Sequence, residues 1–415
     1  MIDFEDYFSP VDSVTDEIIR LQTELTSRIA LGPDNGGTGE HEKVAYVRTL
    51  LEALGPDFVE EYRAPDDRAL DGYRPNLVVR WDGSDSESVI WVLCHSDIVP
   101  PGDLSLWESD PYRVVVDGDR IIGRGVEDNQ HAFVSFYLAM KSVLGSGKGL
   151  KRSVGLVFVA DEETGSRYGL DYLLKNHKGI FRSNDLIVVP DGGNEEGTMI
   201  EVAEKSMLWI KFTVIGEQCH ASMPHRGKNS LSCAASMILA LEEVRNRFDL
   251  SDRLFTPPIS TFEPTKIEAN VPNVNTIPGR DVFYMDCRIL PEYRVDDVIA
   301  AVRDIAEEVS EKRGIRIDTD PVFSLDAPEP TPVDAPVVNA LKEAIKRVTG
   351  KDAEPMGIGG GTVAAFFRKE GLPAAVWSTV SESAHQPNEY CLIPNIITDA
   401  KVFASLFMSG RDRRQ

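Results

Sequence analysis

The sequence predicts an α/β protein in which a mostly parallel sheet is interrupted by a smaller, ferredoxin-like α+β domain. Short apolar runs alternate with helix-type repeats in the first half of the chain, which is typical of parallel strands joined by helices. After about Val202 the expected order becomes strand, helix, strand, strand, helix, strand, as in a ferredoxin-like sandwich. A length of 415 residues also exceeds what one compact core usually holds. We therefore expect a discontinuous domain of residues 1–203 and 320–415 and an inserted domain of residues 204–319.

Helices and then strands are expected in the first part of the chain. The first helix covers residues 13–31, where four apolar residues recur at helical spacing as far as Ile29. The second helix covers residues 42–54. The strands expected after them lie at residues 76–81, 89–94, 152–160 and 186–190. A further helix over residues 132–144 is apolar on almost every face, so we expect it to be buried.

The inserted domain is expected to combine helices with an antiparallel sheet. Residues 208–215 alternate between apolar and polar side chains, as a strand with one buried face does. The other strands are expected at residues 259–267, 282–290 and 315–319, and the helices at residues 229–248 and 295–313. A proline-rich segment, residues 326–336, then leads to a helix that Asp334 would cap.

The composition argues against some classes of function. The chain carries 44 basic and 67 acidic residues, a formal charge of −23, which disfavours nucleic-acid and anionic-membrane partners. Solubility in a salt-tolerant host explains this charge better than steering of a substrate does. The five cysteines form no CxxC pair, which indicates a reducing compartment without disulfides. With no signal-peptide pattern and no apolar run of ~18 residues, we expect a soluble, cytoplasmic protein.

Residues 155–166, GLVFVADEETGS, are the most informative stretch. An apolar run predicts a strand buried on both faces, and Asp161, Glu162 and Glu163 follow it directly. Adjacent carboxylates repel each other unless a cation or a shared proton lies between them. In α/β sheets the carboxyl ends of strands are also where ligands bind. Taken alone, the acidic triplet is equally well explained as a solvated turn.

Other metal-type ligands occur at comparable places. His95 ends one predicted strand, and Asp97 stands two residues later, where its carboxylate can orient the imidazole. Asp128 lies in the glycine-rich GRGVEDN, Asp191 follows a buried strand, and His385 comes much later. Carboxylates and imidazoles without a thiolate suit Zn²⁺, Mn²⁺ or Co²⁺, with zinc first. Together with the carboxylates of the acidic turn, these candidate ligands are too many for one catalytic ion. They suit two ions that share a carboxylate. The alternative is a set of unrelated surface residues.

Seven motifs along the chain carry a family resemblance. They are HSDIVPPGDLSLWESDPY, GRGVEDN, DEETGS, VPDGG, GEQCHASMPHRGKNSL, NVNTIPG and SAHQPNE. In this order they resemble the di-zinc amidohydrolases, the family of succinyl-diaminopimelate desuccinylase, acetylornithine deacetylase, aminoacylase, carboxypeptidase G and the carnosinase-like dipeptidases. The likeness runs from about residue 15 to residue 405. It implies a zinc-exopeptidase-like catalytic domain, an inserted lid or dimerisation domain, and two divalent ions, zinc before cobalt or manganese.

The resemblance also implies a role for each ligand. His95 and Asp191 would hold one ion. Glu163 and His385 would hold the other, with Asp128 bridging the two.

Neighbouring residues would complete the chemistry. Two cations lower the pKa of a water between them to about 7. Glu162 would act as the general base that accepts a proton from this water and passes it to the leaving amine. Asp97 would brace His95. In the family the peptide bond after the bridging aspartate is cis, so we expect a cis bond between Asp128 and Asn129.

The inserted domain would supply contacts with the substrate. His220 would donate a hydrogen bond to the oxyanion. In the family this histidine reaches across a dimer into the partner's site, so we expect a homodimer. Asn275 and Arg288 match the family's contacts with a substrate carboxylate, although an arginine in a strand is more often a solvated residue.

A glycine-rich loop and one late glutamate complete the expected site. The loop GIGGGT, residues 357–362, opens a predicted helix, where free N–H groups bind anions. Because the loop lacks the lysine of a phosphate-binding loop, we interpret Gly360, Gly361 and Thr362 as contacts with a carboxylate or oxyanion. Glu389 is expected to support His385.

Two departures from the family leave the substrate open. Gln130 and His131 replace a common Lys-Gly pair, so the start of the following helix is not defined by the resemblance. Asp191 replaces the glutamate of the deacylase branches and resembles the dipeptidase branch. We expect metal-dependent hydrolysis of an amide in a small carboxylate-bearing substrate, an N-acyl amino acid, with a dipeptide as the alternative. The remaining alternatives are an inactive dimeric binding module and a nucleotide-binding protein that uses GIGGGT.

Overall fold

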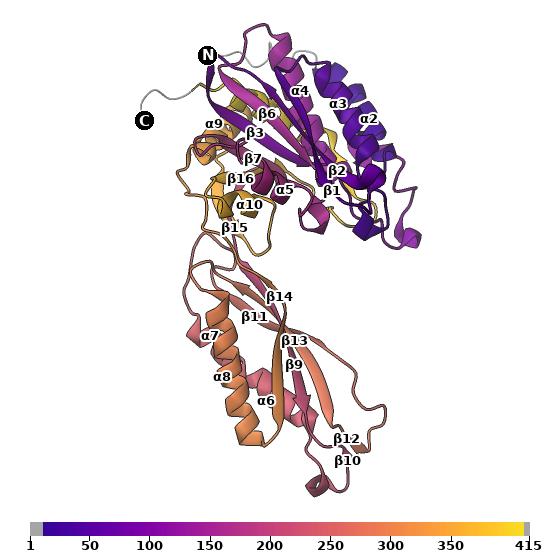
Figure 1. Ribbon diagram of the computed structural model, residues 1–415, viewed down its shortest axis with the longest axis vertical. Coiled ribbons are helices and arrows are strands. Elements are labelled where there is room, and N and C mark those ends of the chain that lie inside the picture. The colour runs from indigo at the N-terminus through magenta and orange to yellow at the C-terminus, as the bar shows by residue number, and fades with distance from the viewer. Residues whose placement is uncertain (1–10, 411–415) are drawn as a thin grey trace. The chain divides into compact units, whose positions relative to one another are not determined.

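The computed structural model describes residues 11–410, and the chain falls into two compact units (Figure 1). Unit 1 comprises Met1–Val202, Thr331–Pro355 and Phe366–Gln415. Unit 2 comprises Ala203–Pro330 and Met356–Ala365. The chain therefore contributes to unit 2 twice, once with a long insertion and once with the short glycine-rich loop.

Unit 1 is built on a mixed sheet of eight strands. Its strands, in spatial order, are β1 (Phe58–Pro65), β2 (Tyr73–Trp81), β6 (Arg152–Val159), β3 (Asp85–His95), β7 (Leu186–Asn194), β16 (Ala374–Thr379), β8 (Met199–Glu204) and β15 (Glu354–Ile358). The central strands β6, β3, β7 and β16 run parallel, whereas β1, β2 and β8 pair in antiparallel fashion. The predicted α/β class with a mostly parallel sheet is confirmed.

Burial explains why the central strands form. Every residue of β6 is buried, and β3 is buried from Ser88 to its end, as expected for parallel strands covered on both faces. The helices in or at the border of unit 1 are α2 (Val11–Ser27), α3 (His41–Glu52), α4 (His131–Gly145), α5 (Leu170–Asn176), α9 (Pro336–Thr349), α10 (Ala364–Lys369) and α11 (Ile393–Phe407). Helix α4 packs against α11 and α2, and its Phe133 and Phe136 are fully buried. The expected buried helix is thereby confirmed. Figure 1 shows α2, α3 and α4 along one side of the sheet.

Unit 2 contains a four-stranded antiparallel sheet. Its strands, in spatial order, are β11 (Thr261–Ile267), β13 (Arg280–Ile289), β9 (Ser206–Ile215) and β14 (Arg316–Leu325). This is the strand order of a ferredoxin-like sandwich. Side chains at every second position of β9, from Leu208 to Val214, join a core with α6 (Ser230–Ala240) and α8 (Val295–Arg313). A two-residue pair, β10 (Cys219–His220) with β12 (Thr276–Ile277), lies beyond the sheet.

Three details at the ends of elements differ from expectation. Helix α9 has Ala335 as its N-cap and Pro336 as its first residue, so Asp334 does not cap it; proline is preorganised for the first helical position. The helix expected over residues 229–248 is divided into α6 and α7 (Glu242–Arg247). Strand β14 continues through Pro321, because it is an edge strand with an irregular register there, and such positions need no donor from proline.

Two broad expectations can also be compared with the structure. All five cysteines are free thiols, as predicted. Between residues 11 and 410, no helix has both the length and the apolar composition needed to cross a membrane.

Candidate metal centre

The parallel strands of unit 1 bring distant candidate ligands to one edge of the sheet. His95 is the last residue of β3, and the turn that carries Glu162 and Glu163 begins three residues after the end of β6. Asp191 lies in β7 just after its buried part. Because β3 lies between β6 and β7 and is parallel to both, their carboxyl ends meet.

Asp128 stands between the two histidines of the cluster. Its Oδ1 lies 2.8 Å from Nε2 of His95, and its Oδ2 lies 3.1 Å from Nε2 of His385. His95 Nε2 is also 3.4 Å from Asp191 Oδ1, and His385 Nε2 is 3.0 Å from Glu163 Oε2. Two ligands of one tetrahedral zinc ion, each ~2.0–2.2 Å from the metal, lie roughly 3.3 Å apart. The donor atoms therefore fit a pair of divalent cations that share Asp128.

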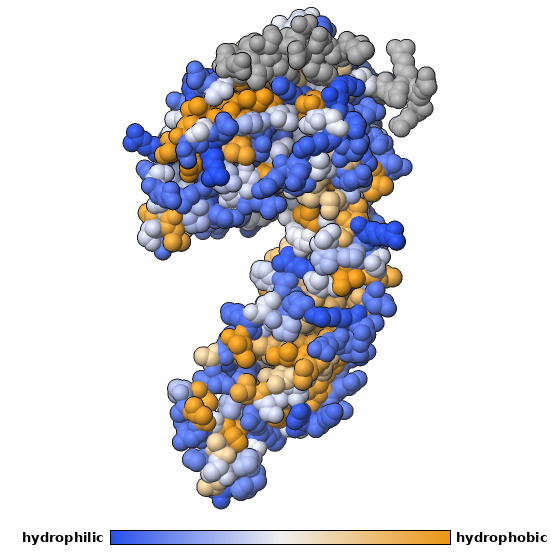
Figure 2. Space-filling model, turned by 180° about the vertical axis from the view of Figure 1, so that it is seen from behind, coloured by the Kyte–Doolittle hydropathy of each residue, from blue (hydrophilic) through white to orange (hydrophobic). Residues whose placement is uncertain are grey.

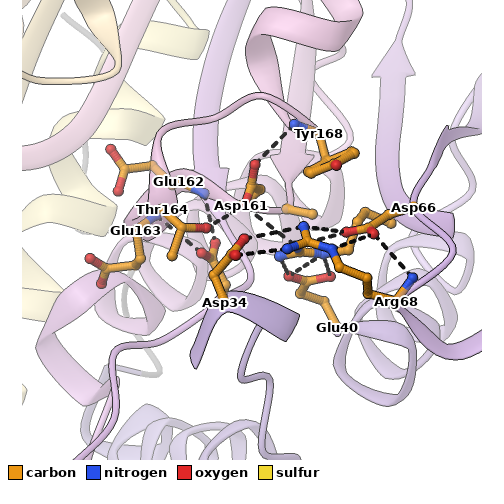
Figure 3. Close-up of polar contacts among 12 residues, drawn as sticks. Asp34, Glu40, Asp66, Arg68, Asp161, Glu162, Glu163, Thr164 and Tyr168 are labelled. Carbon is orange, nitrogen blue, oxygen red and sulfur yellow. Dashed lines mark hydrogen bonds and ion pairs between the residues drawn. The ribbon is translucent and has the colours of Figure 1, made fainter. Parts of the chain in front are cut away.

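Glu162 and Glu163 differ in their contacts, although both approach the cluster. Donor atoms of His95, Glu162 and Asp191 lie within 4.8 Å of one another, as do those of His95, Asp128 and Glu163. Glu163 contacts His385, whereas the Glu162 carboxylate accepts no hydrogen bond from residues 11–410. Figure 3 shows both carboxylates pointing away from Glu40 and Asp66, which lie on the other side of the turn.

Asp97 supports the centre in a way that differs in detail from expectation. His95 Nδ1 donates to the backbone carbonyl of Asp97 at 3.0 Å, while the Asp97 carboxylate lies 3.6 Å away. That carboxylate instead accepts hydrogen bonds from the backbone N–H groups of Glu162 and Glu163, each at 3.1 Å. With Nδ1 donating, Nε2 of His95 keeps its lone pair for a metal. Asp97 thus holds the histidine through its main chain and the acidic turn through its side chain.

A buried ion cluster lies behind the acidic turn (Figure 3). Asp161 has a left-handed backbone, with φ of 63°, and accepts hydrogen bonds from Arg74 Nη1 at 3.3 Å and from Tyr168 N at 3.0 Å. Arg74 also donates to both carboxylate oxygens of Glu40. Both side chains of this ion pair are fully buried. Burial, which outweighs the hydrogen bonds from Arg74, raises the pKa of Glu40 to about 7.

Burial and crowding of charge shift the ionisation of the cluster. Burial, followed by the charge of Asp191, raises the pKa of Glu162 well above its ordinary value. Burial raises the pKa of Glu163 to about 7 despite its hydrogen bond with His385. Hydrogen bonds with Asp128 and Glu163 raise the pKa of His385 to about 10. Bound divalent cations would take the place of these protons.

The turn that leads into α4 has the expected backbone. The peptide bond between Asp128 and Asn129 is cis, as predicted. The Asn129 side chain donates to Pro190 O at 2.9 Å and to Asp191 Oδ1 at 2.6 Å. Helix α4 begins at His131, which defines the start of the helix that the family resemblance did not define.

Glu389, expected to support His385, instead contacts the segment of Asp128, the candidate bridging ligand. Its fully buried carboxylate accepts hydrogen bonds from the backbone N–H groups of Gly125, Glu127 and Asp128 at 3.0–3.1 Å. Burial raises the pKa of Glu389 to about 7. No pattern in the sequence assigns a role to Asn129, Glu127 or Arg74; only the position of the first two inside the GRGVEDN motif points to them.

The predicted substrate contacts of unit 2 form two separate groups. His220 and Asn275 lie together, since Ala221 N donates to Asn275 O at 2.9 Å. Arg288 lies elsewhere: it is paired with Asp286 and donates to Gly359 O in the glycine-rich loop at 2.9 Å.

These two groups lie at opposite ends of the unit 2 sheet. Arg280 follows β12 closely and therefore marks the His220 end of the sheet. Arg288 lies eight residues further along β13, a span of roughly 26 Å.

The glycine-rich loop already binds an internal carboxylate. Thr362 N donates to Glu204 Oε1 at 2.9 Å, and the Thr362 hydroxyl donates to the same oxygen. Gly360 and Gly361 precede Thr362 in this loop. A substrate carboxylate would have to replace Glu204 to use the same N–H group.

Comparisons with known proteins agree with this description. A sequence profile of the peptidase family M20/M25/M40 matches residues 91–409. An uncharacterized metallohydrolase of Methanococcus maripaludis is 40% identical, over 95% of this chain and 99% of that protein. A succinyl-diaminopimelate desuccinylase of Pelagibacter ubique is 26% identical over 75% of this chain and 80% of that protein. The structure of human carnosine dipeptidase 1 shares the fold, with a TM-score of 0.67 and 19% identity over 98% of this chain and 99% of that chain.

Proposed function

Since the chain belongs to peptidase family M20/M25/M40 and is therefore a metallohydrolase of amide bonds, we propose that it deacylates a small N-acyl amino acid that carries a carboxylate. The name of the desuccinylase relative supports this substrate class. The single observation that supports metal-dependent hydrolysis is the position of Asp128, which presents one oxygen to His95 and the other to His385.

Six side chains of unit 1 would share the work. His95 and Asp191 would hold one cation and Glu163 and His385 the other, with Asp128 contacting both. Bound there, zinc ions would supply Lewis acidity and lower the pKa of a water. The Glu162 carboxylate, which has no hydrogen-bond donor among residues 11–410, is available to accept the proton of the attacking water and return it to the leaving amine.

We further propose that His220 acts from a second copy of the chain. A substrate that contacts Arg288 lies roughly 26 Å from the His220 end of the same unit 2 sheet, so one chain cannot supply both contacts. Unit 2 also exposes large apolar side chains such as Leu239 and Trp209. Figure 2 shows hydrophobic residues scattered over its surface, in the lower part of the picture. A homodimer through unit 2 would cover some of them.

Asp191 favours a second candidate, a dipeptidase, because the resemblance associates aspartate at this position with the dipeptidase branch. The fold shared with human carnosine dipeptidase 1 is compatible with it.

A hydrolysis screen separates the candidates. The protein, loaded with zinc or cobalt, is offered N-succinyl and N-acetyl amino acids beside unmodified dipeptides. We expect cleavage of the acylated amino acids. A requirement for a free amino terminus would favour the dipeptidase. Metal-loaded protein that cleaves neither class would support an inactive binding module.

A further inference from the structure

We propose that Glu127 is a positioning residue that holds the loop of residues 380–389, the His385 loop, and thereby fixes the geometry of one of the two metal sites. The proposal rests on the metal pair described above. It assigns a task to a side chain that is not itself a ligand.

The His385 loop cannot position its histidine through regular structure. Between Val380 and Glu389 the chain forms no helix or strand. Glu382, His385 and Asn388 have left-handed backbones, with φ of 54°, 64° and 58°. Such conformations are uncommon for residues other than glycine and persist where surrounding contacts impose them.

His385 is also the most exposed ligand. Its side chain is 56% exposed, compared with 1% for His95, 5% for Glu163 and 18% for Asp128. Packing therefore restrains His95 directly, whereas His385 depends on the contacts of its loop.

Glu127 supplies such contacts. It is 3% exposed, and its Oε2 accepts a hydrogen bond from Ser383 N at 2.8 Å. Ser381 N donates to the other oxygen, Oε1, and the Ser383 hydroxyl contacts Oε2. One carboxylate thus binds two backbone N–H groups, four and two residues before His385. A side chain with a single acceptor oxygen cannot reproduce this arrangement.

The His385 loop and the segment that contains Asp128 hold each other through reciprocal contacts. Glu127 precedes the bridging Asp128 and binds the chain before His385. Glu389, four residues after His385, binds the backbone N–H groups of Glu127 and Asp128 in return. The chain then continues into β17 (Tyr390–Leu392), which pairs with β5 (Arg120–Ile122). The bridging ligand and His385 are therefore tied to each other from both sides.

Burying further carboxylates beside this cluster costs free energy unless hydrogen-bond donors compensate their charge. Glu127 and Glu389 are both buried beside a cluster that already contains several carboxylates. Their oxygens are balanced by N–H donors, and Glu389 also by Arg124, whose Nη1 lies 2.6 Å away. Since these donors belong to the two segments that carry Asp128 and His385, the carboxylates serve the spacing of these ligands.

A metal titration of Glu127→Gln tests the proposal. The substitution keeps the shape but replaces one acceptor oxygen by an N–H₂ donor. Metal-free protein is titrated with Co²⁺, followed by its visible absorption, and with Zn²⁺ by calorimetry. The wild type should bind two ions per chain. In Glu127→Gln one site should keep its affinity while the other weakens by about 10–100-fold, the usual effect of a residue that orients a ligand.

Asp185→Asn is the matched control. Asp185 is 5% exposed and accepts hydrogen bonds from Val89 N, Trp91 Nε1 and Arg182 N near the start of β3, at the end of this strand away from His95. The Asp185→Asn variant should have a lower free energy of unfolding but an unchanged metal affinity at both sites. If Glu127→Gln unfolds, Ser383→Ala, which removes one donor to the same carboxylate, should weaken the same site by a smaller factor.

The outcomes are distinct. Two unchanged sites in Glu127→Gln, or two sites weakened equally, would overturn the proposed positioning role while leaving the metal pair intact. A wild type that binds fewer than two ions would overturn the metal pair and the positioning role together.

Discussion

Replacing Arg74 by methionine should destabilise unit 1 strongly. The Arg74 guanidinium donates to Glu40 at 2.8 and 3.0 Å and to Asp161 at 3.3 Å, and the Arg74–Glu40 pair is fully buried. Arg74→Met leaves Glu40 buried without its partner, which typically costs about 3–5 kcal/mol. The measurement is the free energy of unfolding of metal-free protein in urea. It is followed by the fluorescence of the tryptophans buried in unit 1, Trp81, Trp91, Trp107 and Trp377.

The loss should also depend on pH. The pKa of Glu40 is already about 7 with Arg74 present, because burial raises it, and it rises further without the guanidinium. An acid whose folded pKa lies above its unfolded value destabilises the fold increasingly as pH rises from the unfolded to the folded pKa. Arg74→Met should therefore lose less stability near about pH 5 than near about pH 8.

Two controls sharpen this prediction. Arg68 also pairs with an acid of the cluster, Asp66, but its side chain is 48% exposed, so Arg68→Met should cost less than about 1 kcal/mol. Combining Arg74→Met with Glu40→Gln removes both charges and should be less harmful than Arg74→Met alone. An Arg74→Met variant as stable as Arg68→Met, or a double variant less stable than both, would contradict this prediction.

Three further predictions follow from the site. Glu162→Gln should lower kcat by roughly 10²–10⁴-fold while metal content, measured by mass spectrometry, stays at the wild-type level; full activity would exclude Glu162 as the base. Because hydrogen bonds with Asp128 and Glu163 raise the pKa of His385 to about 10 in the metal-free protein, this imidazole is protonated near neutral pH. Zinc binding should therefore release protons and strengthen as pH rises towards about 10; calorimetry in two buffers of different ionisation enthalpy measures the release, and binding without it would contradict the pKa shift. Finally, an equal mixture of Glu162→Gln and His220→Ala chains should regain about a quarter of wild-type activity after subunit exchange, since half of the dimers then contain one complete site; no recovery would place His220 outside the partner's site.

The candidate ligands at strand ends are the part of the proposed site that the sequence predicts best. His95, Glu163 and Asp191 each follow a run of buried apolar residues, so the strands can be recognised and their parallel order brings the ends together. Asp128 and His385 lie in a turn and a loop, where no periodic pattern exists. Only their resemblance to family motifs points to them.

Residues that support the ligands are much harder to predict. Arg74 lies in a strand, where a charged residue usually indicates a solvated face, and its partner Glu40 is 34 positions away. Glu127 contacts Ser383 across 256 positions. Such pairs depend on the packing of segments that are distant in the sequence, and no local pattern of residue types encodes that packing.

From the sequence, Asn275 and Arg288 are expected to contact the same substrate. Both belong to the inserted segment, and their resemblance to the family is equally local. The antiparallel sheet separates them, because β13 is fully extended between Arg280 and Arg288. The assignment of both residues to one substrate therefore depends on a second chain.

Anomalous diffraction from zinc-loaded crystals tests the central claim most directly. We expect two peaks per chain roughly 3.5–4 Å apart, one beside His95 and Asp191 and one beside Glu163 and His385, with an Asp128 oxygen on each. Glu162 should contact neither ion. A single peak, or an ion coordinated by Glu162 in place of Glu163, would contradict the account.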